Sequence, residues 1–170
     1  MLYSSAASSL SQVFTAFKRK TVRDRKGVLL VDFMPIGTTI NANRYCETLR
    51  KLWRAIENKR RGMLSGGIVL LHDNACPHTA AATQELLDQF VWEIFDHLPY
   101  SPVLAPSDFH LFLKQKEFLG DKCFGSDVEL ENAVTTCLNE PAAEDYNMGV
   151  LQLVDRYDNS LNVGGDYVEK

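Results

Sequence analysis

The chain has 170 residues, of which 45% are apolar and 24% charged, and its formal net charge is -4. This size suits one domain with a buried core, and the composition is that of a globular protein rather than a fibrous or disordered one. No apolar run approaches the roughly 18–20 residues that span a bilayer, and residues 1–10 lack the basic and apolar regions of a secretory signal. We therefore expect neither a membrane segment nor export.

Charge is divided unevenly along the chain. Through Arg61 there are thirteen Lys and Arg against four Asp and Glu, and after it there are five against eighteen. A basic segment of this kind often contacts a polyanion. Two solvated surfaces of opposite sign explain the same counts more simply, so charge alone assigns no function.

The four cysteines are widely separated, with no CxxC pair and no histidines at zinc-ligand spacing; they are Cys46, Cys76, Cys123 and Cys137. We interpret them as reduced thiols of an intracellular protein, neither a zinc site nor a disulfide framework.

The first third of the chain predicts a hairpin and a helix. Residues 12–23 and 27–33 are expected to form two strands, joined by a turn at residues 24–27. Residues 38–41 offer N-cap side chains for a helix through about Arg60. Its apolar stripe, at helical spacing, consists of Tyr45, Leu49, Leu52 and Ile56.

The middle of the chain alternates strand and helix. Residues 68–71 (IVLL) are a continuous apolar run, typical of a strand that is buried on both faces. A turn at residues 73–78 leads into a predicted helix over 79–90, and 91–95 is predicted to be another short strand.

The last third is predicted to be helical. A Pro-rich loop, 98–106, precedes a helix that begins near Ser107. Residues 126–129 (SDVE) form a capping box that opens a helix to about Asn139, and a final helix fits 144–157. The element order β-β-α-β-α-β-α-α predicts an α/β sheet with helices on its faces.

Asp73 is the first candidate for chemistry. It follows the apolar run 68–71, and in an open α/β sheet ligands bind at the carboxyl ends of the strands. Asn74 and His78 come directly behind it. A carboxylate that merely caps the following turn explains this segment equally well.

Asp108 is the second candidate, in YSPVLAPSDFHLF (residues 100–112), where the prolines hold an extended loop and a helix begins. Taken alone, an acid in the first turn of a helix is the simpler explanation. However, 34 residues of helix, strand and loop separate Asp73 from Asp108. Such a span can return the chain to the same edge of the sheet.

The segments HDNACPHTA and YSPVLAPSDFHLF together resemble the two signature blocks of mariner transposases. Their 34-residue interval matches the spacing between that family's second and third catalytic aspartates. The resemblance continues through GVLLVDFMPIGTTINANRYCETLRKLWRAIENKRRG and LNVGGDYVEK, and covers about residues 24–170. The chain is similar in the same way to the transposase half of SET-domain–mariner fusions, although it contains no SET methyltransferase sequence.

The resemblance implies a ribonuclease H-like mixed sheet with flanking helices, and Mg²⁺-dependent DNA cleavage and strand transfer. In the family three acidic residues hold two Mg²⁺ (or Mn²⁺) ions, hard cations that prefer oxygen ligands. Asp73 and Asp108 would be catalytic, metal-binding residues. The resemblance also implies DNA as the partner, a homodimer and a nuclear location. Residues expected near DNA, from the motifs and the basic helix, are Asn74, His78, Tyr100, Arg50, Arg54, Lys59, Arg60 and Arg61.

The sequence departs from the family at its beginning. The family's first catalytic aspartate lies in a Gly-Asp-Glu segment on the first, central strand, and no such segment occurs here. We therefore expect residues 1–20 to lie outside the family, and 21–170 to form a truncated domain that lacks the central strand. Residues 13–17 are a candidate to fill the gap. The helix-turn-helix modules that read transposon ends are also absent, so DNA binding should be non-specific.

Asp24 and Asp32 do not replace the missing aspartate. Asp24 is expected in the hairpin turn. The strand that ends near Asp32 should lie two positions from the Asp73 strand, about 10 Å away and too far to share a metal cluster.

Three functional hypotheses follow from these observations. The first is an inactive remnant of a transposase, whose metal binding is doubtful because one acid is missing. The second is an active metal nuclease whose missing strand is encoded upstream. The third is a non-catalytic module that binds nucleic acid or protein through the basic helix 43–61.

Overall fold

The computed structural model describes residues 11–16, 20–33, 38–95, 104–105, 112–120, 122–140 and 143–162. The chain divides into two compact units. The first comprises Met1–Asp24 and Val28–Pro99, and the second comprises Arg25–Gly27 and Tyr100–Lys170. Among the described residues, no helix is long and apolar enough to cross a bilayer.

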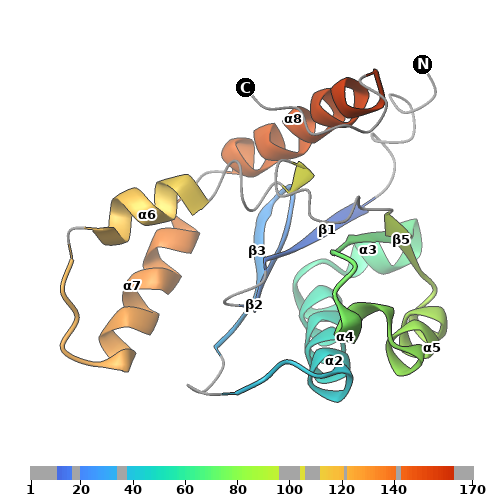
Figure 1. Cartoon of the computed structure of the whole chain (residues 1–170), viewed down its shortest axis with the longest axis horizontal. Coiled ribbons are helices and arrows are strands. Elements are labelled where there is room, and N and C mark those ends of the chain that lie inside the picture. The colour runs from blue at the N-terminus through green and yellow to red at the C-terminus, as the bar shows by residue number, and fades with distance from the viewer. Residues whose placement is uncertain are drawn as a thin grey trace. The chain divides into compact units, whose positions relative to one another are not determined.

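The first unit is built on a five-stranded mixed sheet (Figure 1). Its strands are β1 (Ser11–Ala16), β2 (Lys20–Asp24), β3 (Gly27–Asp32), β4 (Ile68–Leu71) and β5 (Trp92–Phe95), in the spatial order β3-β2-β1-β4-β5. β1 pairs with β2 in antiparallel fashion, whereas β1 with β4 and β4 with β5 are parallel pairs.

The prediction of one strand over residues 12–23 is wrong. The segment forms two strands, β1 and β2, in which Phe14 lies opposite Arg23 and Ala16 opposite Thr21. A single strand of this length would extend well beyond the four residues of β4 and leave its backbone groups without partners. Reversing the chain pairs those groups within the segment instead.

The expectation that the sheet lacks its central strand is also wrong. β1 occupies the middle of the sheet and pairs with β4 from Ser11 opposite Ile68 to Phe14 opposite Leu71. The candidate segment 13–17 thus overlaps a strand that lies beside β4. Because β5 covers the other edge of β4, both edges of this buried strand are hydrogen-bonded.

The prediction of a basic helix after the hairpin is confirmed. Helix α2 (Ala42–Lys59) begins at Asn41, whose side chain accepts a hydrogen bond from the backbone N–H of Arg44. Its predicted stripe is buried and packs in a core with residues of the sheet and of α5, among them Leu29, Leu70, Leu87 and Trp92. A short helix, α3 (Arg61–Gly66), follows.

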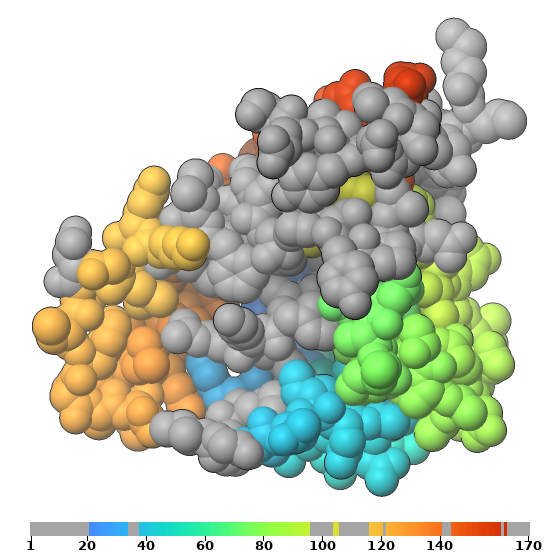
Figure 2. Space-filling model, viewed as in Figure 1, coloured from blue at the N-terminus to red at the C-terminus, as the bar shows by residue number. Residues whose placement is uncertain are grey.

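The predicted helix over residues 79–90 corresponds to α5 (Ala81–Phe90), which begins two residues later than predicted. A short helix, α4 (Cys76–Thr79), occupies part of the predicted turn at residues 73–78. Ala80 between them is extended (φ -63, ψ 144), which ends the first helix and starts the second. Figure 2 shows the cyan atoms of α2 beside the green atoms of α4 and α5. The predicted strand 91–95 begins one residue later, because Val91 forms the left-handed C-cap of α5.

The second unit contains three described helices, α6 (Phe112–Gly120), α7 (Asp127–Asn139) and α8 (Ala143–Asn162). The predicted capping box is formed in part: the Ser126 side chain accepts from Glu129 N, whereas the Glu129 carboxylate accepts from Gly125 N rather than from the N–H of Ser126. Helix α8 extends five residues beyond its predicted end. The predicted helix start near Ser107 lies outside the described residues.

Candidate active site

Asp73 lies at the carboxyl end of β4, as predicted. All four residues of β4 are buried, which agrees with a strand that has neighbours on both edges, and Ile68 and Leu70 pack in the core with residues of α2 and α5. Asp73 is the second residue after the strand, and its side chain is 40% exposed. The end of a buried strand thus presents a carboxylate that reaches solvent.

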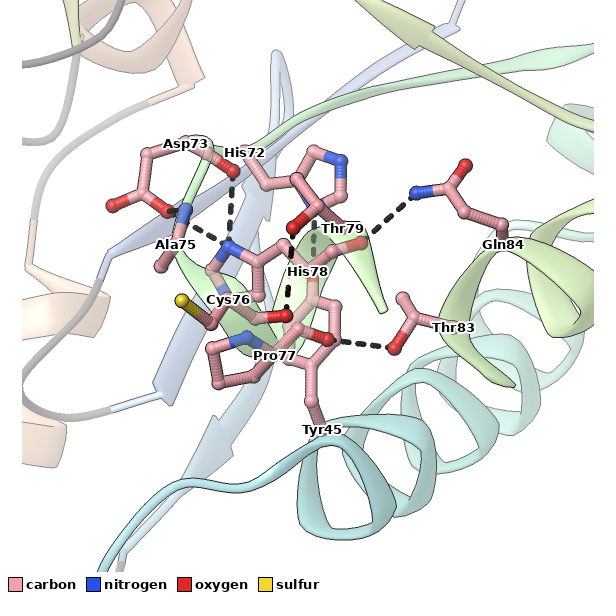
Figure 3. Close-up of polar contacts among 10 residues, drawn as sticks. All are labelled: Tyr45, His72, Asp73, Ala75, Cys76, Pro77, His78, Thr79, Thr83 and Gln84. Carbon is pink, nitrogen blue, oxygen red and sulfur yellow. Dashed lines mark hydrogen bonds and ion pairs between the residues drawn. The ribbon is translucent and has the colours of Figure 1, made fainter. Parts of the chain in front are cut away.

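The two oxygens of the Asp73 carboxylate have different surroundings (Figure 3). Oδ1 accepts a hydrogen bond from the backbone N–H of Ala75 at 2.9 Å, and His78 Nδ1 lies 2.8 Å from the same oxygen. Among the described residues, Oδ2 accepts no hydrogen bond, and in Figure 3 it points away from the other labelled side chains. Within the described part of the chain, one oxygen is therefore held by protein groups and the other is not.

His78 supports Asp73 from the interior. Its side chain is only 1% exposed, so it is not placed to contact DNA directly. Helix α5 holds the short helix α4 that carries it. The hydroxyl of Thr83 donates to the carbonyl of Pro77 at 2.7 Å, and the side-chain amide of Gln84 donates to the carbonyl of His78 at 2.9 Å.

Tyr45 and His72 complete a buried aromatic cluster around His78. The Tyr45 ring centroid lies 4.0 Å from that of His78, and the His72 ring lies 5.0 Å from His78. The Tyr45 hydroxyl is 2.9 Å from His72 Nδ1. Burial raises the pKa of Tyr45 well above its usual range, and the negative charges of Asp73 and Cys46 raise it further. The phenol therefore keeps its proton and can donate it.

Sequence reasoning missed the roles of Tyr45 and His72. Tyr45 was assigned only to the apolar stripe of the helix, and His72 had no assigned role. A tyrosine within a buried stripe is itself a signal, because its hydroxyl needs a partner inside the protein. Nothing in the linear sequence identifies that partner, since 27 residues separate the two.

Asp24 and Asp32 are both engaged elsewhere. Arg60 Nε donates to Asp24 Oδ2 at 3.0 Å, and Lys51 Nζ donates to Asp32 Oδ1 at 2.7 Å. The expected separation of β3 from β4 needs correction, because both β1 and β2 lie between them. Three strand spacings amount to about 14 Å, so Asp32 is even farther from Asp73 than expected.

The expected nucleic-acid-binding residues differ in their availability. Arg50, Arg54, Arg61 and Asn74 are exposed. Lys59 Nζ donates to the carbonyl of Leu29, and Arg60 is bound to Asp24. Tyr100 and Asp108 lie outside the described residues, so their distance from Asp73 stays a prediction.

The comparisons with known proteins agree with this arrangement of elements. Residues 24–65 match the family model of the transposase partial DDE domain. The chain is 33% identical over 148 residues to the mariner Mos1 transposase of Drosophila mauritiana, covering 86% of this chain and 43% of that protein. A crystal structure of the Mos1 catalytic domain matches with a TM-score of 0.85 and 30% identity, over 98% of this chain and 87% of that chain. This chain belongs to the mariner transposase family.

Its mariner fold is the α/β, ribonuclease H-like fold of the Mos1 catalytic domain. The chain is also 29% identical over 144 residues to the human histone-lysine N-methyltransferase SETMAR, covering 84% of this chain and 21% of that protein. It thus spans less than half the length of either curated relative. The Mos1 catalytic domain has been solved with Mg and with Mn, which supports a divalent metal for the mariner family.

The described residues do not fit a two-ion mariner metal site. Among them, no three His, Cys, Asp or Glu side chains lie close enough together to hold a metal ion. Asp73 offers one oxygen. β1, the strand that takes the central place beside β4, cannot add a carboxylate, because the first 23 residues contain neither Asp nor Glu.

Proposed function

We propose that this chain is a mariner transposase catalytic domain that does not assemble a complete metal site and therefore does not cleave DNA by itself. One observation carries the proposal. The central strand β1, one of the two that pair with β4 in parallel, comes from Ser11–Ala16, a segment with no acidic residue. In the family this central strand supplies the first of three catalytic aspartates.

The chemistry of Mg²⁺ explains why one missing acid matters. Mg²⁺ demands near-ideal octahedral geometry and gives up its waters reluctantly. Asp73 contributes one available oxygen, and Asp108 is the second ligand that the family resemblance suggests. A hydrated dication gains little from two carboxylates, because its own waters satisfy most of its coordination. DNA cleavage and strand transfer then stay properties of the family's intact members.

A plasmid-nicking assay tests the proposal. Supercoiled DNA is incubated with the chain in Mg²⁺ or Mn²⁺, beside Asp73→Asn and a matched surface control, Asp88→Asn in α5. We expect equal, background nicking from all three proteins. Metal-dependent nicking by the unaltered chain that disappears only in Asp73→Asn would overturn the proposal.

Restoring the acid provides a complementary test. Continuing the parallel register by two residues beyond Phe14 opposite Leu71 brings Ala16 level with Asp73. The variants Thr15→Asp and Ala16→Asp place a carboxylate at the two positions around this level. We expect one of them to bind Mn²⁺ more tightly than the unaltered chain, as measured by electron paramagnetic resonance of free Mn²⁺. If both variants bind Mn²⁺ no more tightly than the unaltered chain, the missing acid is not the reason for weak metal binding.

DNA binding without cleavage is the second candidate function. Arg50, Arg54 and Arg61 are exposed, and relatives have been solved as a Mos1 paired-end complex and a pre-cleavage transpososome. Binding through such residues is sequence-independent. A plot of the logarithm of the association constant against the logarithm of the salt concentration has a slope of about -0.9 for each phosphate contact. Fluorescence anisotropy measures this slope, and the double variant Arg50→Ser/Arg54→Ser should reduce its magnitude by up to about 2. Affinity that is independent of salt would exclude this mode.

A nuclear location and a homodimer, which the family resemblance implies, belong to the same proposal.

A further inference from the structure

The hydrogen-bonding state of His78 follows from its two neighbours. Its Nδ1 lies 2.8 Å from Asp73 Oδ1 and 3.1 Å from the Asp73 carbonyl oxygen. A carbonyl oxygen and a carboxylate oxygen both accept hydrogen bonds. Nδ1 of His78 must therefore carry the hydrogen, which it shares between these two oxygens.

His72 has the opposite arrangement. Its Nδ1 lies 2.9 Å from the Tyr45 hydroxyl, and among the described residues no other group is hydrogen-bonded to that hydroxyl. A buried hydroxyl needs an acceptor, and donating to His72 Nδ1 supplies one. The ring of His72 then accepts at Nδ1 and carries its hydrogen at Nε2.

We propose that His72 and His78 are held as opposite tautomers, and that this arrangement makes His78 the positioning residue of Asp73. Tyr45 from α2 orients His72 through its hydroxyl and packs on the ring of His78. His78 in turn fixes Oδ1 of Asp73, together with the Ala75 N–H. The local segment 72–78 and the sequence-distant Tyr45 of α2 thus together determine the orientation of one carboxylate.

The consequence for ligand binding is specific. Because Oδ1 already accepts two hydrogen bonds, Asp73 has only Oδ2 to offer to a cation. Asp73 would act as a ligand through one oxygen, not as a chelating pair. This consequence rests on the proposed role of Asp73 as a retained metal-binding residue, whereas the tautomers do not depend on that role.

Long-range ¹H–¹⁵N correlation spectra of the full chain, labelled at histidine and recorded at neutral pH, test the proposal. His72→Asn and His78→Asn assign the two rings, and His97 and His110 serve as references. We expect the ¹⁵N chemical shifts of His78 Nδ1 and His72 Nε2 to be those of ring nitrogens that carry a hydrogen. A His78 ring protonated at Nε2 alone would overturn the proposal, and so would two rings with the same tautomer.

Two pairs of variants separate the links of the network. Asp73→Ala removes the carboxylate but keeps the backbone carbonyl, so Nδ1 of His78 should stay protonated while its ¹⁵N shift changes, and His72 should be unchanged. Asp73→Asn, which keeps a side-chain acceptor oxygen, should change that shift less. Tyr45→Phe should alter His72 alone, and the matched Tyr157→Phe should alter neither ring. A His78 Nδ1 shift that is identical in the unaltered chain and in Asp73→Ala would contradict the positioning role. If a variant fails to fold, the spectrum of the unaltered chain still decides the tautomers.

The two proposals fail in different experiments. Metal-dependent nicking by the unaltered chain refutes the proposed loss of cleavage and leaves the tautomers as they are. An incorrect tautomer refutes the positioning network, whatever the nicking assay gives.

Discussion

Tyr45→Phe removes one buried hydroxyl and leaves the rest of the ring in the core. The hydroxyl donates to His72 Nδ1 at 2.9 Å, and both side chains are almost fully buried. A typical hydrogen bond contributes about 0.5–1.5 kcal/mol net, and a buried acceptor left without its donor costs about 1–3 kcal/mol. We therefore expect the free energy of unfolding to fall by about 2 kcal/mol at neutral pH, which lowers Tm by roughly 4–8 °C for a chain of this size.

The same variant has a predictable effect at alkaline pH. Burial raises the pKa of Tyr45 in the folded chain, whereas in the unfolded chain this pKa is about 10. Above that pH the unfolded state releases the proton and the folded state keeps it, so the folded protein loses about 1.36 kcal/mol of stability per pH unit. Phenylalanine has no such proton. The 2 kcal/mol gap between the two proteins should therefore close by about pH 11.5.

Urea unfolding followed by tryptophan fluorescence measures both effects. Trp53 and Trp92 are the only tryptophans, and both lie in the first unit with Tyr45. Tyr157→Phe in α8 is the matched control, because it deletes the same hydroxyl in the second unit. The reasoning is refuted if Tyr45→Phe is as stable as the unaltered chain at neutral pH. A gap that stays constant up to pH 11.5 would refute the assigned pKa shift.

Three further predictions concern stability. Val91→Gly should stabilise the first unit by about 1 kcal/mol, because φ of Val91 is 56°, a left-handed conformation that disfavours branched side chains. The side chain is 82% exposed, so its removal loses little packing. A lower urea midpoint would contradict this prediction. Arg60→Leu should lower the free energy of unfolding by about 3 kcal/mol, because it leaves the Asp24 carboxylate buried without this cation. Urea unfolding followed by fluorescence measures the change, and an unchanged midpoint would contradict the prediction. Ser126→Ala should cost about 1 kcal/mol in helix α7, seen in thermal unfolding by circular dichroism, with Ser126→Asn as the variant that keeps the cap.

Local patterns predicted those elements whose residues interact within a few positions of each other. Helix α2 was predicted because its cap, Asn41, and its apolar stripe lie within one segment. The buried strand β4 and the Ser126 capping box were predicted for the same reason. In each case neighbouring residues carry the whole signal, so no knowledge of distant segments is required.

The pairing of strands could not be predicted in this way. Residues 12–23 have strand-forming composition throughout, and only the short length of β4 and the reversal onto β2 divide them into two strands. The break at Ala80 between α4 and α5 was missed as well. The bonds that hold it are local, since the Thr83 and Gln84 side chains donate to the carbonyls of Pro77 and His78, six positions back, but such bonds leave no hydrophobic periodicity in the sequence.

The sequence alone determined the family, the strand that delivers Asp73 and the absence of any acid before Asp24. These properties depend on residue identity and short-range periodicity, which can be read directly. Only the tertiary structure decided that an acid-free segment lies beside β4, that His78 is buried against one oxygen of Asp73, and that Tyr45 and His72 support it. Such contacts join segments up to about 60 residues apart, and their selection depends on which backbone and side-chain groups remain unsatisfied once the core has packed.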